Sequence, residues 1–217
     1  MSLKVRLATA ATALLIGSAA HAQMPSLNIM VGPTYASRET NGPAFESDPI
    51  FTIGGGGGFR FGNRTFGFEP GVLIVSKGTS QTDGDVDNRL KLDYIELPVL
   101  GIITIGSKSM LHPFIGGGPV VSLEMRCRVE SIRGNSKEEI GCDLPNSATF
   151  DRHKVDLGVA GLAGVEYAIS SSKRIALQAR YTHGLSNISD TEDSALLIHN
   201  RAWSFYVSYS LPLKPDF

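Results

Sequence analysis

The last part of the sequence, residues 202–213, alternates almost without exception between large apolar and smaller or polar side chains. Side chains of a β-strand point to opposite faces in turn, so this pattern predicts a strand with one apolar face. Similar alternation recurs in seven earlier segments, which restricts the chain to an all-β fold. The apolar side of the last segment is Trp203, Phe205, Val207, Tyr209 and Leu211, and the other side is Ala202, Ser204, Tyr206, Ser208 and Ser210.

Eight strands are expected, joined by three short and four long connections. The short, polar connections are at 62–64, 106–109 and 170–173, and the long, hydrophilic ones are at 37–50, 77–89, 126–153 and 186–200. Short and long connections alternate in outer-membrane barrels, where the short ones face the periplasm. The strands are predicted at 27–36, 51–62, 65–76, 90–105, 110–125, 154–168, 174–185 and 201–213.

The beginning of the sequence has the layout of a cleaved secretory signal. Lys4 and Arg6 precede an apolar run over residues 7–20, and the small-residue segment 20–22 ends it. A membrane anchor is the alternative, but the run is shorter than the roughly 20 residues that a spanning helix needs. We therefore expect residues 1–22 to be removed and residues 23–217 to form one barrel domain in the outer membrane of a Gram-negative cell.

The two faces of the predicted strands differ in charge. One face carries apolar side chains in every strand, and the opposite face carries the charged side chains of the strand interiors. Charges facing lipid are costly, whereas inside a narrow barrel they can pair. The pattern thus predicts an eight-stranded antiparallel up-and-down transmembrane β-barrel, with a lumen charge network of Arg60, Glu69, Glu96, Glu166 and Arg180.

Glycines and prolines interrupt some of these strands. The glycines at 54–58 and 116–118 lack the Lys-Ser/Thr sequel of a phosphate-binding loop, so we interpret them as points where a small barrel bends or accommodates large lumen side chains. Proline removes a hydrogen-bond donor from a strand, so bulges or strand ends are expected at four positions. These are Pro70, Pro98, Pro113 and Pro119.

Cys127 and Cys142 are the only cysteines. In an exported protein they are expected to form a disulfide, because the chain passes through an oxidising compartment. A metal site is the alternative, but no matching histidine spacing accompanies the two thiols. No cofactor and no metal ion are predicted. The formal net charge is −1 without a basic stripe, which argues against a nucleic-acid partner.

Two segments resemble a known family. Residues 94–100, Tyr-Ile-Glu-Leu-Pro-Val-Leu, and residues 113–119, Pro-Phe-Ile-Gly-Gly-Gly-Pro, are similar to the PorT-like outer-membrane β-barrel proteins. The resemblance extends over essentially the whole mature chain, with the first segment as its most specific part. It implies a small eight-stranded barrel without general enzymatic activity, and it transfers no catalytic or binding residues. Phe217 stands where barrels commonly end in an aromatic residue that the assembly machinery reads, although Pro212, Pro215 and Asp216 precede it.

The first functional hypothesis is a non-enzymatic outer-membrane protein with a structural role or a binding role at the cell surface. Its expected partners are outer-membrane lipid, the barrel assembly machinery, and an extracellular ligand or protein contacted through the 126–153 loop. A solvated loop without any partner is the alternative. A narrow small-solute pore is a further possibility, since eight strands leave a lumen filled by side chains rather than a wide channel.

A lipid-modifying enzyme, similar to lipid A deacylases, is a second hypothesis. His183 and Ser186 lie near one strand end, yet no spacing prescribes a catalytic triad, so we do not expect an enzyme. A soluble barrel with an apolar ligand is disfavoured because the charged residues share the inner face. The other candidates for catalysis are His112, His153, His199, Ser122, Ser189 and Ser194.

Overall fold

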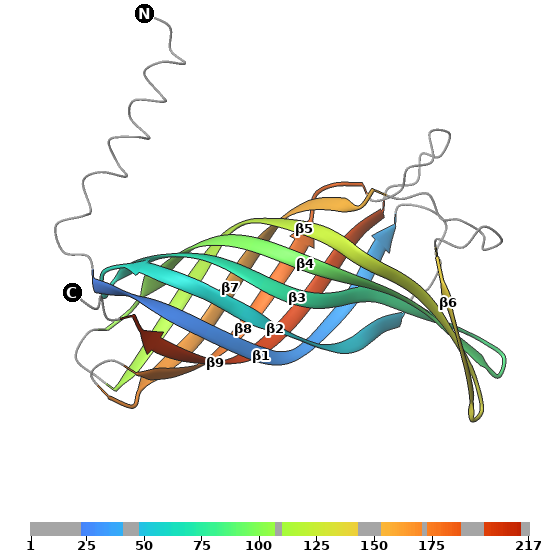
Figure 1. Cartoon of the computed structure of the whole chain (residues 1–217), viewed down its shortest axis with the longest axis horizontal. Coiled ribbons are helices and arrows are strands. Elements are labelled where there is room, and N and C mark those ends of the chain that lie inside the picture. The colour runs from blue at the N-terminus through green and yellow to red at the C-terminus, as the bar shows by residue number, and fades with distance from the viewer. Residues whose placement is uncertain are drawn as a thin grey trace, which may run out of the picture.

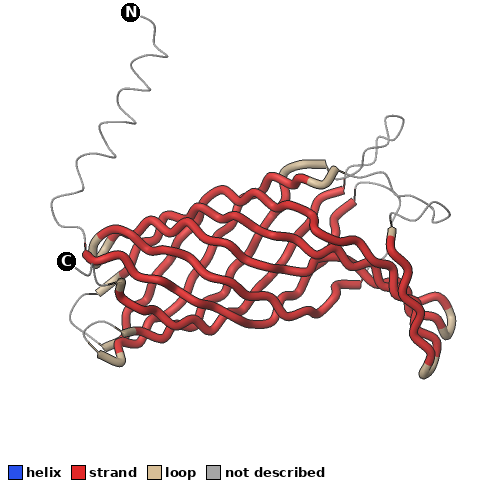
Figure 2. Tube along the Cα trace, in the orientation of Figure 1, coloured by secondary structure: helices blue, strands red, loops and turns tan. Residues whose placement is uncertain are grey.

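The computed structural model of the chain describes residues 23–40, 48–106, 110–142, 153–170, 173–187 and 198–213. These residues form nine β-strands in one antiparallel sheet, and no helix occurs among them (Figures 1 and 2). The strands are β1 (Gln23–Thr40), β2 (Asp48–Gly62), β3 (Phe66–Asp83), β4 (Val86–Thr104), β5 (Leu111–Arg133), β6 (Ser136–Gly141), β7 (Val155–Ala168), β8 (Arg174–Gly184) and β9 (Ile198–Pro212).

Eight of these strands close into a barrel. Each pairs with its neighbour in the chain, except that β5 pairs with β7, and β9 closes the ring against β1. The predicted all-β up-and-down barrel is therefore confirmed. The first residues of β1 and the last of β9 pair at one end, which we call the terminus end, and the turns of the β3–β4 and β5–β6 hairpins lie at the other, the loop end (Figure 1).

The ninth strand, β6, corrects the predicted loop at 126–153. β5 continues to Arg133, and β6 pairs back onto it across a turn in which Gly134 has φ of 55°. The predicted loop at 77–89 is wrong as well, because β3 and β4 continue as a hairpin that turns at Gly84, with φ of 56°. Both extensions consist largely of polar residues. They lack the apolar alternation from which the strands were predicted, so the sequence did not indicate them.

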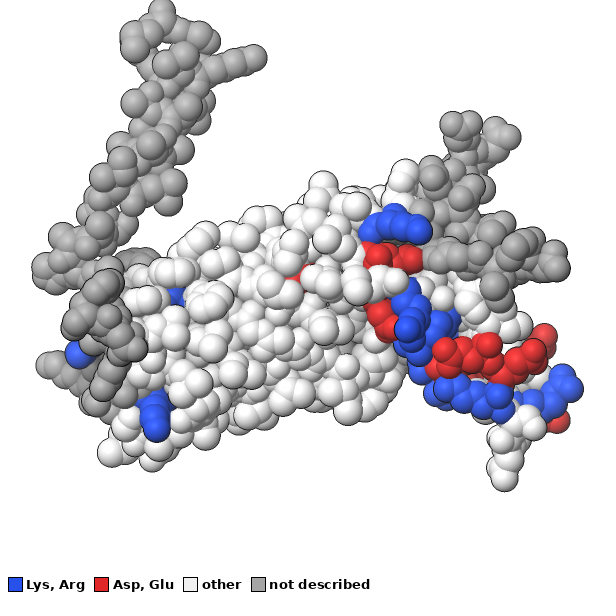
Figure 3. All heavy atoms as spheres, in the orientation of Figure 1, with Lys and Arg blue, Asp and Glu red and all other residues white. Residues whose placement is uncertain are grey.

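The outer face of the barrel is apolar, as the alternation predicts. None of the side chains assigned to the lipid-facing side is buried, and charged residues gather at the loop end over β4, β5 and β6 (Figure 3). An aromatic row of paired residues crosses β8, β9, β1 and β2 on this face. It consists of Tyr181, Trp203, Tyr35 and Phe51, and more aromatics lie toward the terminus end, among them Phe61 and its partner Phe68. Such aromatic girdles flank the apolar band of membrane barrels.

The glycine-rich strand segments allow close contact between backbones. A Cβ atom on Gly56 would lie 2.0 Å from the carbonyl oxygen of Val72, and one on Gly118 would lie 2.1 Å from that of Val99. Of the bulges or strand ends expected at the prolines, Pro113 lies near the beginning of β5, and no bulge occurs at any of the four positions. The pairing is interrupted beside Pro70 and Pro98, but its register is unchanged, so each proline costs hydrogen bonds locally without displacing the strand.

The predicted signal at 1–22 lies outside the described residues. Within the described part of the chain, no helix is long and apolar enough to cross a membrane.

Candidate interaction surface

The extensions of β3, β4 and β5, together with β6, form a four-stranded sheet that projects from the loop end. We call this sheet the arm and define it as residues 76–93 and 126–142 (Figure 1). Three of its strands are continuous with barrel strands, so the arm has no separate attachment. It contains the first part of the segment that the sequence assigned to a binding loop. Residues 143–152 of that segment lie outside the described residues.

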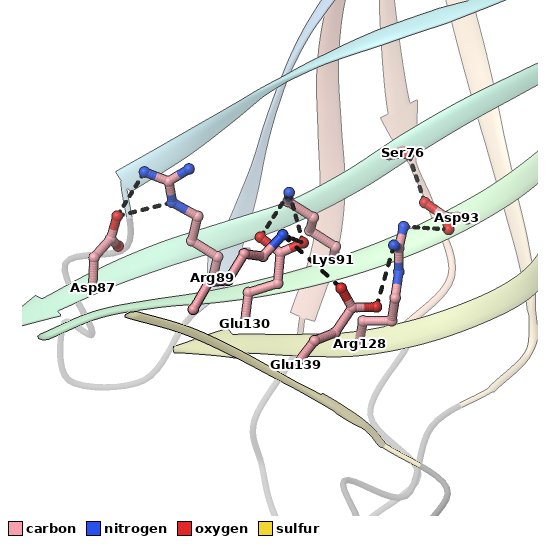
Figure 4. A network of polar contacts seen from close by, with 9 residues as sticks. Ser76, Asp87, Arg89, Lys91, Asp93, Arg128, Glu130 and Glu139 are labelled. Atoms are coloured by element: carbon pink, nitrogen blue, oxygen red, sulfur yellow. Dashed lines mark hydrogen bonds and ion pairs between the residues drawn. The ribbon is translucent and has the colours of Figure 1, made fainter. Parts of the chain in front are cut away.

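The outer face of the arm is covered by ion pairs (Figure 4). Arg128 Nη2 lies 2.7 Å from Asp93 Oδ2, and Asp93 also accepts a hydrogen bond of 2.6 Å from the hydroxyl of Ser76. The second guanidinium nitrogen, Arg128 Nη1, reaches Glu139 at 3.5 Å. These contacts join β3, β4, β5 and β6, so polar side chains link all four strands of the arm.

Glu130 is the centre of a second group on the same face. Glu130 is only 3% exposed. Its carboxylate forms ion pairs with Lys91 Nζ at 2.9 Å and with Lys137 Nζ at 3.1 Å. Burial by itself raises the pKa of the Glu130 carboxyl, but the hydrogen bonds and charges of the two lysines outweigh it and lower the pKa below its ordinary value. Glu130 therefore stays ionised in the folded arm.

The inner face of the arm is apolar. Leu90, Val129 and Ile140 are paired across three strands, and the last two are 37% and 43% exposed. At the base of the arm, Leu92 and Tyr94 pack against the disulfide of Cys127 and Cys142, whose Cα atoms are 5.4 Å apart. The disulfide closes a loop of 15 residues. In the chain-entropy model this cross-link stabilises the folded state by roughly 3 kcal/mol.

The predicted lumen residues separate into three layers along the barrel. At the terminus end, Arg60 lies 2.9 Å from Glu69 and also contacts Glu166, which in turn receives Arg174 at 3.5 Å. These three predicted residues are thus brought together. Arg174 belongs to the same group, although the sequence reasoning treated it only as the beginning of a strand.

Glu96 lies in a different layer, at the loop end of the lumen. Its carboxylate is 2.7 Å from Lys77 Nζ, and the hydroxyl of Ser122 lies between them at 3.5 and 3.4 Å. Lys77 was missed because it falls in a segment assigned to a loop. Its odd number continues the inward series of β3 from Glu69, which is the signal that could have identified it.

Arg180 occupies the middle of the lumen without an acidic partner among the described residues. It is 2% exposed, its Nη2 lies 3.9 Å from the sulfur of Met30, and its guanidinium carbon lies 5.6 Å from the centre of the Tyr206 ring. Its Nε and Nη1 atoms have no hydrogen-bond partner. The single network expected from the sequence is therefore divided, because apolar layers lie between the charges. They include Leu100, Phe114, Val120 and Leu162 in one cluster and Met30, Leu73, Val75 and Tyr206 in another.

The candidates for catalysis do not form one group. Ser122 lies in the lumen beside Glu96, whereas His183 lies on the outer face and stacks on His199. The hydroxyl of Ser186 accepts a hydrogen bond of 3.0 Å from the backbone N–H of Leu157. Ser189 and Ser194 lie outside the described residues.

Comparisons with known proteins agree with this architecture. A family model described as an outer membrane protein beta-barrel domain matches residues 22–190. A search of curated proteins finds no match. Neisserial surface protein A is 14% identical, with a TM-score of 0.53, 88% of this chain covered and 99% of that chain. OprG from Pseudomonas aeruginosa is 10% identical, with a TM-score of 0.50 and coverages of 89% and 98%.

Structural similarity at 10–14% sequence identity shows a shared fold. The match to the family model shows membership of the family. The apolar outer face, the closed sheet and the match over most of the sequence all lead to the same assignment. The chain belongs to the family of the outer membrane protein beta-barrel domain and is an outer-membrane protein.

Proposed function

We propose that this protein is a non-enzymatic barrel that presents the arm at the cell surface for binding to an extracellular ligand or protein. The observation that carries the proposal is the arm itself, an ordered sheet that extends beyond the apolar band. In barrels of this kind the long connections face the outside, which would place the arm in contact with the medium. Membership of the narrower PorT-like group is part of the same proposal.

The inner face of the arm supports a binding role. Val129 and Ile140 lie on the arm, beyond the aromatic row, and are exposed. The disulfide and the ion pairs hold these side chains on one sheet, so binding would not have to order a flexible loop first. Exposed apolar residues within a polar rim are typical of protein interaction sites.

Photo-crosslinking on intact cells tests this proposal. A photoreactive phenylalanine analogue replaces Ile140 on the arm, and Ile53, which is 72% exposed on the lipid-facing side, is the matched control position. We expect a discrete protein or glycan adduct from position 140 that position 53 does not give. Identical adduct patterns from both positions, in a chain that folds normally, would contradict a binding role for the arm.

A narrow passage for small anions is the second candidate, and Arg180, which has no acidic partner among the described residues, favours it. Burying a guanidinium without a carboxylate partner is costly, and positively charged side chains that line a pore are typical of anion-selective channels. Conductance of the purified protein in planar bilayers distinguishes the two functions. A passage of this kind predicts an anion-selective current that Arg180→Met abolishes, whereas no current above the bilayer background would exclude it.

A further inference from the structure

Four rings lie in sequence on the outer face of β8 and β9, on strands that do not contribute to the arm. Trp203 and Tyr181 belong to the aromatic row, and their ring centres are 4.9 Å apart. His183 follows Tyr181 at 6.4 Å, and His199 follows His183 at 6.1 Å, with the imidazoles stacked. The series runs from the apolar band toward the loop end, so its chemistry changes from aromatic and apolar to polar.

The polar end of this series contains nitrogen atoms without partners. Arg201 is paired directly with His183 across the two strands, and its guanidinium forms an ion pair with Glu39 on β1. The Nε atom of Arg201 and the Nδ1 atoms of His183 and His199 are buried and have no hydrogen-bond partner. Arginine is always charged and the Arg201 side chain is 39% exposed, while His183 and His199 are partly exposed, so the accessible nitrogen atoms of these three side chains suit an anionic group with several acceptor oxygens.

The apolar end of the series adjoins a groove. This open groove, of about 440 Å³, lies on the same outer face and is lined by Pro33 of β1, Leu177 and Ala179 of β8, and Phe205 and Val207 of β9. Two local features produce it. Ala179 places a small side chain opposite Phe205, and β1 and β9 are not paired at residues 32–33, where proline has no N–H to donate.

We propose that this strip is a binding site for a membrane lipid with a phosphorylated headgroup. One acyl chain lies in the groove, the glycerol region crosses Tyr181 and Trp203, and the phosphate accepts hydrogen bonds from His183, His199 and Arg201. Ala179 and His183 are four positions apart on β8, a distance of roughly 13 Å along a strand. That separation is similar to the distance from a lipid phosphate to the upper part of its acyl chain. Because the site lies apart from the arm, it goes beyond the proposed surface binding.

The commitment to a lipid, rather than to free phosphate, rests on the groove. A free anion needs only the polar cluster, whereas the groove is lined by β8 and β9, the same two strands that carry the cluster, at positions nearer the terminus end. Tyrosine and tryptophan are typical of the headgroup level of membranes, where an amphiphile has both its apolar and its charged part.

Native mass spectrometry of the full-length protein released from detergent micelles tests the proposal. The probes are phosphatidic acid and diacylglycerol with the same acyl chains, which differ only in the phosphate. We expect the protein to retain phosphatidic acid and to lose diacylglycerol. The double variant His183→Leu/His199→Leu should reduce retention of phosphatidic acid about tenfold, the loss expected for removed hydrogen bonds to a charged group.

A second set of variants tests the groove by filling it with a larger side chain. Ala179→Phe should reduce retention to a similar extent, whereas Val72→Phe, which adds the same ring to the lipid-facing side of β3, should leave it unchanged. Folding of each variant is checked by its migration on gels with and without boiling. Equal retention of the two probes, or equal effects of the two phenylalanine variants, would overturn the proposal. Complete displacement of phosphatidic acid by inorganic phosphate would also overturn it and assign the cluster to a free anion.

Discussion

The pair of Lys77 and Glu96 gives the sharpest test of how the lumen is held together. The two residues are 1% and 3% exposed, and their charged atoms are 2.7 Å apart. Lys77→Met leaves the buried carboxylate of Glu96 with only the distant hydroxyl of Ser122. Breaking a buried pair in this way costs roughly 3–5 kcal/mol, which is a decrease of about 150-fold to several thousandfold in the folding equilibrium constant.

Removing both charges should cost far less than removing one. In Lys77→Met/Glu96→Met no uncompensated charge remains, and replacing a buried pair with apolar side chains of similar size is often nearly neutral. Unfolding by urea in lipid vesicles measures the free energies, and Trp203, the only tryptophan and a lipid-facing one, reports the transition by fluorescence. Lys91→Met is the matched control. It should cost less than about 1 kcal/mol, because its pair is partly exposed and Lys137 remains beside Glu130.

Additive losses in the double variant would refute this reasoning. They would mean that each side chain is stabilised independently, as in a lumen filled with water, where the two charges are screened from one another. The same result would strengthen the case for a passage through the barrel.

Three other variants test other parts of the structure. Arg180→Met should leave the unfolding free energy unchanged or raise it, since it removes a buried charge that has no acidic partner in the described part of the chain; a loss as large as that of Lys77→Met would show that such a partner exists. Val207→Arg should cost roughly 2–4 kcal/mol if the residue lies near the bilayer midplane, and Ser208→Arg much less, as measured by folding yield in vesicles; similar yields would mean that the faces are wrongly assigned. The pKa of Glu130 is lowered on folding, so its contribution is complete above its ordinary value of 4.5 and is lost as the pH falls through the lowered value. Proteolysis of the arm should therefore increase below about pH 4.5 in the wild type, and Glu130→Gln should remove that dependence.

The barrel could be predicted from the sequence because lipid imposes a strict requirement on every second side chain. Residues such as Val207 and Leu177 must be apolar where they face hydrocarbon, and this requirement produces a period of two that can be read directly. It also assigned Arg60, Glu69 and Glu166 to the inner face, where they meet. The depth of each charge could not be predicted, because depth depends on the stagger between strands, so Glu96 and Arg180 were assigned to the wrong neighbours.

The arm could not be predicted, because no such requirement acts on its side chains. Beyond the apolar band, water covers one face and no strong requirement applies to the other, so residues 126–142 have no clear apolar period. Their strands depend on tertiary pairs such as Arg128 with Asp93 and on the disulfide, which a single sequence does not display as a pattern. The turns at Gly84 and Gly134 were the available local signals, since glycine adopts their positive φ without strain.

The continuity of the strands has a mechanical consequence. β5 has 23 residues and is roughly 75 Å long at the usual rise per residue, whereas an apolar band about 25 Å tall uses about ten residues of a tilted strand. About a third of β5, residues 126–133, lies in the arm and is continuous with the barrel wall, with a register shift opposite Asp93 and Tyr94 where the arm begins. Rotation of the barrel about the membrane normal would move the tip of the arm through a wide arc, and a partner that holds two tips would fix the mutual orientation of two barrels without any contact between them in the bilayer.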